Sequence, residues 1–256
     1  MNLYEAIYAR RSVRKFRMEP LDDKTMQGIA AFIKDMEPLF PEIKTSIGMI
    51  DNLAGKSKFQ GVANVSAPYY LAVYTEEKEK CEMNAGYIMQ QLSLYLTARG
   101  VGSCYQGMAR KRDRKMEDEG LSCVLVMAFG YPKSTAVRND YEARRLSMEE
   151  LCAYKERPKS HIKELLETAR LAPSSFNSQP WRFVVYENRF HIFSKKPVGG
   201  RHLFNKHNEI NFGIMLANIM VAAEEIWVDV DLIKLNNITH KSLPNNQYVI
   251  SVLMRP

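Results

Sequence analysis

Several features that would place a sequence in a structural class at once are scarce or missing here. The chain has only four cysteines, Cys81, Cys104, Cys123 and Cys152, and no CxxC pair. This spacing is typical of free thiols in a reducing compartment and argues against a disulfide framework or a zinc site. No run approaches the roughly 18 consecutive apolar residues that span a bilayer. The N-terminus lacks the pattern of a secretory signal. We therefore expect a cytoplasmic protein without membrane contact.

Motifs for common catalytic and binding sites are also absent. No GxGxxG follows an expected strand, and the similar GVGS at residues 100–103 closes a helix instead of opening one. His202 and His207 have poor spacing for a shared metal ion, and no carboxylate pattern accompanies them. No Ser-His-Asp or Cys-His arrangement can be identified. The poor histidine spacing and the missing carboxylates predict that no metal is bound.

The chain is short of acidic charge, with 29 acidic against 36 basic residues and a net charge of +7. A basic protein can bind nucleic acid, but no tract of alternating basic and aromatic residues is present, so we expect no nucleic-acid partner. The basic residues at 110–115 adjoin acidic ones and are best explained as a solvated loop. The cluster ARRSVRK at 9–15 contains Ser12 and has two interpretations: a phosphate-binding clasp or a helix end with cations.

The apolar pattern predicts a succession of helices and strands that starts again after residue 160. Helices are expected at residues 3–10, 21–36, 83–99, 161–171 and 209–226, and strands at 69–75, 123–129, 181–187, 189–194, 228–235 and 247–254. Residues 38–66 are rich in proline and glycine and are predicted to be irregular. A polar stretch at 133–160 contains the best boundary signal, Lys155 to Ser160.

The second succession resembles the first, which suggests an internal repeat. APYYLAVY at 67–74 is similar to QPWRFVVY at 179–186, and NAGYIMQQLSLYLTA at 84–98 is similar to NFGIMLANIMVAAEE at 211–225. The closing strands CVLVMAFGYP and YVISVLMRP both end in proline. We interpret the chain as two related halves, residues 1–155 and 156–256. Two similar units of independent origin remain the alternative.

The two halves carry different chemical groups. Only the first contains the cluster at 9–15, the turn GVGSCYQG at 100–107 and the pair Arg144-Arg145, and only the second contains APSSFNSQPW at 172–181. If the halves pack together, one set from each would form a single composite site. Such a site would offer cations and a hydroxyl to a phosphate, and small polar side chains to a planar ring.

These same segments resemble the flavin-dependent nitroreductase family. The similar segments are YEAIYARRSVRKF at 4–16, GYIMQQLSLYLTARGVGSCYQG at 86–107, VLVMAFGYP at 124–132 and ARLAPSSFNSQPWRFVV at 169–185. The last motif is long and specific, but in ordinary members it follows soon after the first. Its late position here indicates the tandem, rearranged branch, in which one chain imitates the usual homodimer.

The resemblance implies an α+β fold, a three-layer sandwich with a mainly antiparallel sheet flanked by helices. It also implies FMN, with the phosphate bound by Arg10, Ser12 and Arg145, and with Arg11 and Arg144 as less certain members. Arg14 would stabilise the reduced ring. Gln106 and Gly107 would supply a backbone N–H to the ring atom N5. The ring and its ribityl chain would be lined by Pro173, Ser174, Ser175 and Asn177. Phe176 would stack on substrate, or is a core aromatic.

In such an enzyme the chemistry is carried out by the cofactor, so no catalytic side chain is expected. The expected reaction is a ping-pong transfer from NADH or NADPH, through FMN, to a small acceptor such as a nitroaromatic or a quinone. A flavin-binding sensor or carrier without turnover, and a reductive dehalogenase on the same scaffold, remain alternatives. We expect one FMN per chain, and either a monomer that imitates a dimer or a loose homodimer.

Overall fold

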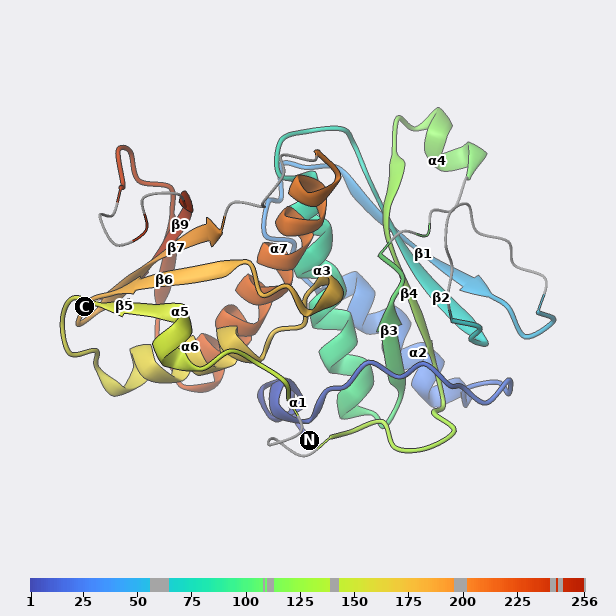
Figure 1. The fold of residues 1–256 in the computed structure, drawn as a ribbon. Helices are drawn as coiled ribbons and strands as arrows, with labels where there is room; N and C mark the ends of the chain where they lie inside the picture. The colour runs from blue at the N-terminus through green and yellow to red at the C-terminus, as the bar shows by residue number, and fades with distance from the viewer. Residues whose placement is uncertain are drawn as a thin grey trace. The chain divides into compact units, whose positions relative to one another are not determined.

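The computed structural model describes residues 1–55, 65–107, 109, 113–138, 143–195, 202–239, 243 and 246–255, with backbone alone at 202–206 and 246. The chain divides into two compact units, Met1–Ala143 and Arg144–Pro256 (Figure 1). This division precedes the boundary expected after residue 155, because strand β5 (Cys152–Tyr154) pairs with β6 (Trp181–Val185) of the second unit. Each unit has its own sheet. The fold is α+β, with mainly antiparallel sheets flanked by helices.

The first unit contains a four-stranded antiparallel sheet in the order β1-β2-β4-β3. Its strands are β1 (Thr45–Asp51), β2 (Tyr69–Thr75), β3 (Gly102–Tyr105) and β4 (Ser122–Gly130). Its helices are α1 (Leu3–Ala9), α2 (Asp23–Asp35), α3 (Cys81–Ala98) and α4 (Arg114–Asp118). Helix α3 packs against the sheet, and α1 and α2 both contact α3.

Strand β1 corrects the expectation that residues 38–66 are irregular. It pairs along its whole length with β2, from Thr45 opposite Thr75 to Asp51 opposite Tyr69. It lies at the edge of the sheet, and its residues are half-buried or exposed. An edge strand of this kind lacks the strong apolar signal of a central strand. Residues 56–64 of that stretch lie outside the described residues.

The second unit contains a five-stranded sheet in the order β5-β6-β7-β9-β8, with only the β5–β6 pair parallel. Its remaining strands are β7 (Arg189–Lys195), β8 (Val230–Ile233) and β9 (Asn246–Met254). Its helices are α5 (Met148–Leu151), α6 (Ser160–Leu171), the short 3-10 turn η2 (Ser175–Asn177) and α7 (His202–Glu225). Helix α6 packs against α7. The stretch 133–160, expected to be only polar, thus contains α5 and β5, which are short elements without a clear periodic pattern.

The two units share one topology. Apart from the short elements α4 and η2, the order is α2, β1, β2, α3, β3, β4 in the first unit and α6, β6, β7, α7, β8, β9 in the second. The sheet orders β1-β2-β4-β3 and β6-β7-β9-β8 then correspond strand by strand. This correspondence matches β2 with β7, and β6 with β1. The sequence comparison of 67–74 with 179–186 is therefore shifted by one strand, whereas those of the long helices and the closing strands agree with the topology.

Two amide side chains make corresponding contacts in the two units. Asn84 on α3 accepts a hydrogen bond through Oδ1 from the backbone N–H of Phe40, between α2 and β1, at 3.0 Å. Asn211 on α7 accepts one through Oδ1 from the N–H of Ser175, between α6 and β6, at 2.9 Å. Each long helix thus holds the loop between the preceding helix and strand. These contacts agree with the sequence register that places Asn84 opposite Asn211.

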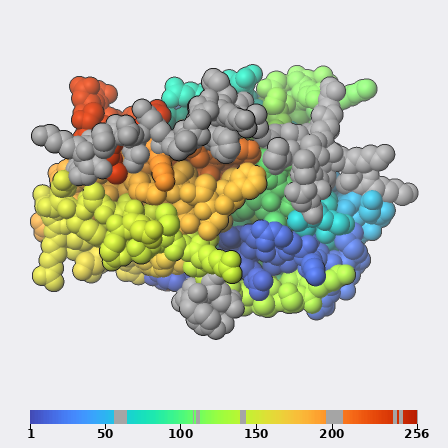
Figure 2. Space-filling model, in the orientation of Figure 1, coloured from blue at the N-terminus to red at the C-terminus, as the bar shows by residue number. Residues whose placement is uncertain are grey.

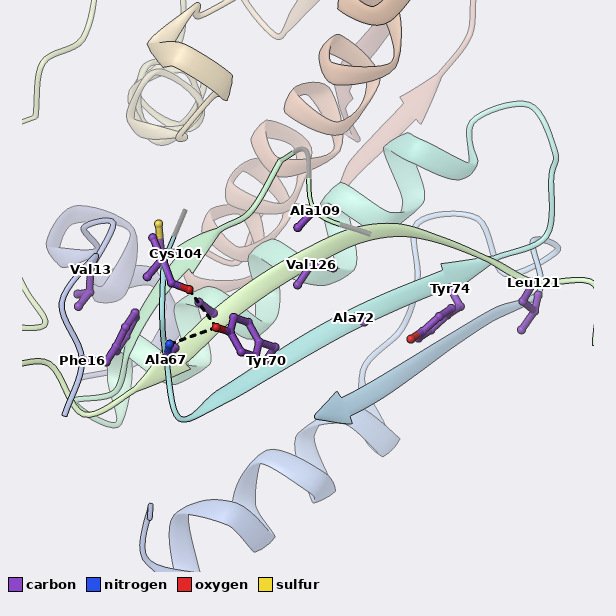
Figure 3. Packing of buried hydrophobic residues seen from close by; sticks show 12 residues of the cluster. Val13, Phe16, Ala67, Tyr70, Ala72, Tyr74, Cys104, Ala109, Leu121 and Val126 are labelled. Atoms are coloured by element: carbon purple, nitrogen blue, oxygen red, sulfur yellow. Dashed lines mark hydrogen bonds between the residues drawn. The ribbon is translucent and has the colours of Figure 1, made fainter. Parts of the chain in front are cut away.

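The core of the first unit extends to the chain segment after α1. Side chains at alternate positions of the central strands, Tyr70 and Ala72 on β2 and Val126 and Ala128 on β4, belong to one buried cluster. The Tyr70 hydroxyl donates to the carbonyl of Val65 at 3.0 Å. Figure 3 shows Val13 and Phe16 at the same end of this cluster as Cys104. These two apolar side chains anchor the segment that carries the N-terminal cations.

Helix α2 begins at a carboxylate whose protonation should affect stability. Asp22 accepts hydrogen bonds from the Tyr131 hydroxyl at 2.7 Å and from the Thr25 backbone N–H at 2.8 Å. These bonds, the one from Tyr131 first, lower the pKa of Asp22 from 3.8 to about 2. Since the unfolded chain binds this proton more tightly, the stabilisation is present above the unfolded pKa and is lost as the pH falls through about 2.

We predict that Tyr131→Phe removes part of this acid-dependent stabilisation. The variant should unfold at a lower temperature than the wild type at about pH 5, and the two melting temperatures should converge as the pH falls toward about 2. Thermal unfolding followed by circular dichroism across this range would measure the difference. A difference that is constant over the whole range would contradict the assignment of the effect to Asp22.

Candidate cofactor site

The segment from Arg10 to Arg14 runs alongside strand β3. Ser12 forms an isolated parallel bridge with Ser103, and the Val13 backbone N–H donates to the Ser103 carbonyl at 2.9 Å. Strand β3 leads directly to Gln106 and Gly107. The structure therefore brings together two sets of predicted site residues, the N-terminal cluster and the turn after β3, that are about 90 positions apart in the printed sequence.

Arg10 is the most unusual residue of this segment. Its side chain is only 5% exposed, and its Nη1 atom is buried without a hydrogen-bond partner among the described residues. Burial lowers the pKa of Arg10, while Tyr105 and Cys104 act in the opposite direction and Arg14 adds to the effect of burial. A buried guanidinium nitrogen without an acceptor is costly to the fold. Such an atom is expected where an anionic ligand completes the site.

The other predicted residues of the first unit differ in exposure. Arg11 and Arg14 are exposed and Ser12 is half-buried. The N-terminal residues, blue in Figure 2, reach the surface on the face drawn there. The alternation of Val13 with Arg14 places an apolar side chain in the core and a cation in solvent. Cations and a hydroxyl are therefore presented along one short stretch of chain.

The turn after β3 is tied to the sheet. Gln106 is buried, its backbone N–H donates to the carbonyl of Val126 at 2.8 Å, and its side chain donates to the carbonyl of Cys104 at 3.0 Å. The N–H of Gln106 is thus committed to β4. That Gly107 offers a backbone N–H to a ligand stays a prediction. Burial raises the pKa of the Cys104 thiol, against the effect of Arg14 and Arg10.

In the second unit, the loop between α6 and β6 has a strained backbone. Phe176, Asn177 and Gln179 have φ angles of 54°, 55° and 43°. Residues other than glycine adopt this left-handed conformation at a cost of about 1–3 kcal/mol each. Three of them within four positions form a feature that local preference alone would not produce. Strain of this kind occurs where a loop is shaped for a ligand.

Side chains hold this loop in its conformation. The buried amide of Gln179 accepts from the Leu146 backbone N–H at 2.8 Å, and the Gln179 N–H donates to the Ser174 hydroxyl at 2.9 Å. Arg145 donates to the Asn177 side-chain oxygen at 3.1 Å and to the Leu171 carbonyl at 3.1 Å. These bonds, and the one that the Ser175 N–H donates to Asn211, stabilise the loop and offset the free-energy cost of its strained backbone.

The predicted residues of the second unit are therefore gathered around one loop. Pro173 is buried, Ser174 and Ser175 are half-buried, and Asn177 is exposed. The Asn177 side chain also donates to the carbonyl of Arg144 at 3.0 Å. The arginine pair thus belongs to the second unit, although the sequence analysis assigned it to the first half. Arg144 is exposed, and Arg145 has a bracing role that the sequence did not indicate.

Phe176 is 85% exposed, and its contact with a substrate stays a prediction. It is not a core aromatic of the second unit. An exposed ring on a strained loop is available to contact a planar ligand.

Three residues with structural roles at these sites were not identified as site residues from the sequence. Gln179 lies in the quoted motif, and Asn211 lies in the repeated helix, so both could have been found. Arg138 lies in the polar stretch 133–160, and nothing in the pattern marks it. Its side chain donates to the carbonyl of Arg10, at 2.8 Å.

Within the described part of the chain, no helix has the length and apolar character needed to cross a bilayer. The same residues contain no group of three or more His, Cys, Asp or Glu side chains arranged to hold a metal ion. Of the two histidines considered as ligands, His202 has no described side chain.

The fold and these groups define an α+β protein with a cation-bearing segment on one unit and a strained polar loop on the other. The family model described as "Putative TM nitroreductase" matches residues 2–223. The chain therefore belongs to this nitroreductase family, which confirms the resemblance seen in the sequence.

The chain is similar to several individual proteins, over its whole length or over part of it. A solved structure of a "putative nitroreductase" from Thermotoga maritima is 22% identical in sequence. The match covers 100% of this chain and 95% of that one, with a TM-score of 0.67. An oxygen-insensitive NADPH nitroreductase of Helicobacter pylori is 36% identical over 73 residues, 26% of this chain. That match spans 33% of the relative's length. An FMN-dependent nitroreductase of Clostridium difficile R20291 is 17% identical and covers 54% of this chain and 94% of its own, with a TM-score of 0.41.

Proposed function

We propose that this protein is an FMN-dependent oxidoreductase that takes electrons from NADH or NADPH and reduces a small electron-poor acceptor, such as a nitroaromatic or a quinone. Membership of the nitroreductase family supports an oxidoreductase. The flavin, the electron donor and the acceptor class are the proposal. One structural observation carries it: the buried Arg10 guanidinium with an Nη1 atom that has no partner among the described residues.

The residues of the first unit fit the phosphate end of FMN. A phosphate dianion accepts several hydrogen bonds from an arginine fork and a hydroxyl, and these charge-assisted bonds are strong. We propose that Arg10, Arg11 and Ser12 form this phosphate clasp. Arg14, one residue beyond Val13, would provide positive charge that favours the more negative reduced state of the ring. Gly107 would bring backbone close to the ring, since it has no side chain to obstruct the approach.

The residues of the second unit fit the rest of the cofactor. We propose that Pro173, Ser174, Ser175 and Asn177 contact the ring and the ribityl chain, and that exposed Phe176 contacts the substrate. Arg145 holds the Asn177 side chain. We therefore propose that Arg145 and Arg144 act at this loop and contribute positive charge there. Gln106, whose N–H is bonded to β4, would support the turn and not contact the ring directly.

We propose that the two units arose by duplication and that the chain binds one FMN. The shared strand order and the corresponding contacts of Asn84 and Asn211 support the duplication. The two units are nevertheless different in their chemical groups. The loop at 36–44, which corresponds by topology to the strained loop, has the sequence MEPLFPEIK and no copy of the PSSFN motif. The second unit has Arg144-Arg145-Leu146-Ser147 before α6 instead of a contiguous RRS, and Arg145 there donates to Asn177 and to the Leu171 carbonyl.

FMN, when bound, would supply the redox chemistry, a two-electron transfer from the nicotinamide donor to the acceptor in a ping-pong sequence. The tasks left to the side chains are to hold the phosphate, to position the ring and to place a substrate beside it. This division of work agrees with the lack of any side-chain nucleophile or general base in the sequence motifs.

An anaerobic titration tests this proposal. Purified protein reconstituted with FMN should lose its visible flavin absorption when NADH or NADPH is added, and should regain it when a nitroaromatic or a quinone is then added. A bound flavin that neither donor reduces would identify a sensor or carrier instead. A protein that takes up no FMN would refute the proposed cofactor.

A further inference from the structure

Helix α1 ends directly at the proposed phosphate clasp, and its C-terminal end is unusual. The last turn contains no basic residue, and the C-cap residue is Arg10 and not a glycine. The final carbonyl groups of a helix need partners from outside the helix. In α1 these partners come from a distant part of the chain.

Arg138 supplies them. Its Nε atom donates to the Arg10 carbonyl at 2.8 Å, across 128 sequence positions, and its Nη2 atom donates to the Ile7 carbonyl at 3.4 Å. Its backbone N–H donates to the Ala9 carbonyl at 2.8 Å. The preceding residue, Val137, forms an antiparallel bridge with Arg10. Arg138 thus contacts the backbone on both sides of the point where the helix ends.

This contact affects the Arg10 side chain. The backbone of Arg10 is held from one direction by the Arg138 fork, while the next residues are held by β3 through the Val13 N–H. A buried side chain has few alternative rotamers, so its direction depends on the position of its own backbone. Two contacts therefore orient Arg10, whose Nη1 atom has no partner among the described residues: the one from Arg138 and the one between Val13 and β3. The contact from Arg138 is made by its side chain, so a substitution can remove it.

We propose that Arg138 is a positioning residue for the phosphate clasp and sets the orientation in which Arg10 meets the phosphate. This inference rests on the proposed function, since it takes the ligand of Arg10 to be the phosphate of FMN. If Arg138 only capped the helix, its removal would change the affinity for flavins with and without a phosphate equally. If Arg138 positions Arg10, its removal weakens binding only of the flavin that carries a phosphate.

The experiment compares the affinities of the flavin-free protein for FMN and for riboflavin, which has the same ring and ribityl chain without the phosphate. Arg138→Ala should weaken FMN binding about tenfold and leave riboflavin binding unchanged. The variant loses the hydrogen bond from the charged Arg138 side chain to the Arg10 carbonyl, so the Arg10 guanidinium is no longer held toward the phosphate. Arg138→Lys keeps the charge but lacks the fork, and should fall between wild type and Arg138→Ala. Arg17→Ala is the matched control, since the Arg17 side chain is exposed and pairs with Glu19, and its backbone bond to the Tyr131 carbonyl is kept in the variant.

The outcomes separate the two proposals. Wild-type protein that does not prefer FMN to riboflavin would refute the phosphate clasp itself. If the wild type prefers FMN, equal losses for both flavins in the Arg138 variants would show a merely structural role, and unchanged affinities would show no role. Either result overturns the inference. Should Arg138→Ala fail to fold, the ratio of the two affinities in Arg138→Lys provides the same test.

Discussion

Replacing Arg10 by methionine is expected to stabilise the flavin-free protein and at the same time to weaken FMN binding. The guanidinium is buried, and its Nη1 atom has no acceptor among the described residues. An unsatisfied buried polar group costs about 1–3 kcal/mol, and more when it is charged. Methionine fills a similar volume without that cost. The free energy of unfolding without flavin should therefore rise by about 1–3 kcal/mol, and FMN affinity should fall at least about tenfold.

Denaturant unfolding of the flavin-free protein and an FMN titration measure the two effects. Arg17→Met is the control, because it removes an arginine that is exposed and lies outside the clasp. Its effect on unfolding should stay within about 0.5 kcal/mol, and FMN affinity should not change. If Arg10→Met destabilised the flavin-free protein, the burial of Arg10 would serve the fold and not a ligand.

The second large effect is expected from Gly102→Ala at the start of β3. A Cβ atom on Gly102 would lie 2.7 Å from Val13 Cγ2 and 2.8 Å from Val13 Cβ. Forcing these atoms apart in a packed core costs about 1–3 kcal/mol. The displaced segment carries the phosphate clasp, so FMN affinity should fall together with stability. Thermal unfolding and FMN titration of the purified variant test both parts of the prediction.

A second substitution shows whether the clash with Val13 is the cause. Val13→Ala removes the Cγ atoms and should itself be destabilising, since Val13 is buried. In the double variant Gly102→Ala with Val13→Ala, the combined loss of stability should be smaller than the sum of the single losses. Additive losses would show that the Val13 Cγ atoms are not the cause, since Val13→Ala keeps the Cβ atom that would lie 2.8 Å away.

Much of the fold could be predicted from local pattern alone. The expected strand at 69–75 coincides with β2, and the expected helix at 161–171 differs from α6 by one residue. Both are buried or clearly amphipathic, and so their periodicity is strong. Strand β1 was missed because an edge strand with half-buried residues has no such signal. The shift of one strand in the repeat has a related cause, since β2 and β6 both follow a proline and are both fully or largely buried.

The candidate site could be predicted only where its residues lie in contiguous motifs. Arg10, Ser12 and the PSSFN segment each lie in a short contiguous motif. In the structure Arg10 is buried with an Nη1 atom that lacks a partner among the described residues, and the PSSFN segment has positive φ angles. The contact of Arg138 with Arg10 spans 128 positions and uses a backbone carbonyl, which leaves no trace in either local sequence. The hydrogen bond from Arg145 to Asn177 likewise leaves no trace in the local sequence. The structure places both arginines in the second unit. The strained φ angles of the loop are a property of tertiary context, not of residue type.

We propose that the chain binds a single FMN, because the chemical groups of its two units differ. The most direct test is the stoichiometry of flavin to protein, measured by visible absorption on protein saturated with FMN and freed of excess cofactor. We expect one FMN per chain, and we expect Arg10→Met to reduce this ratio. Two FMN per chain would contradict this expectation, because a second phosphate would then be bound without Arg10 and Ser12.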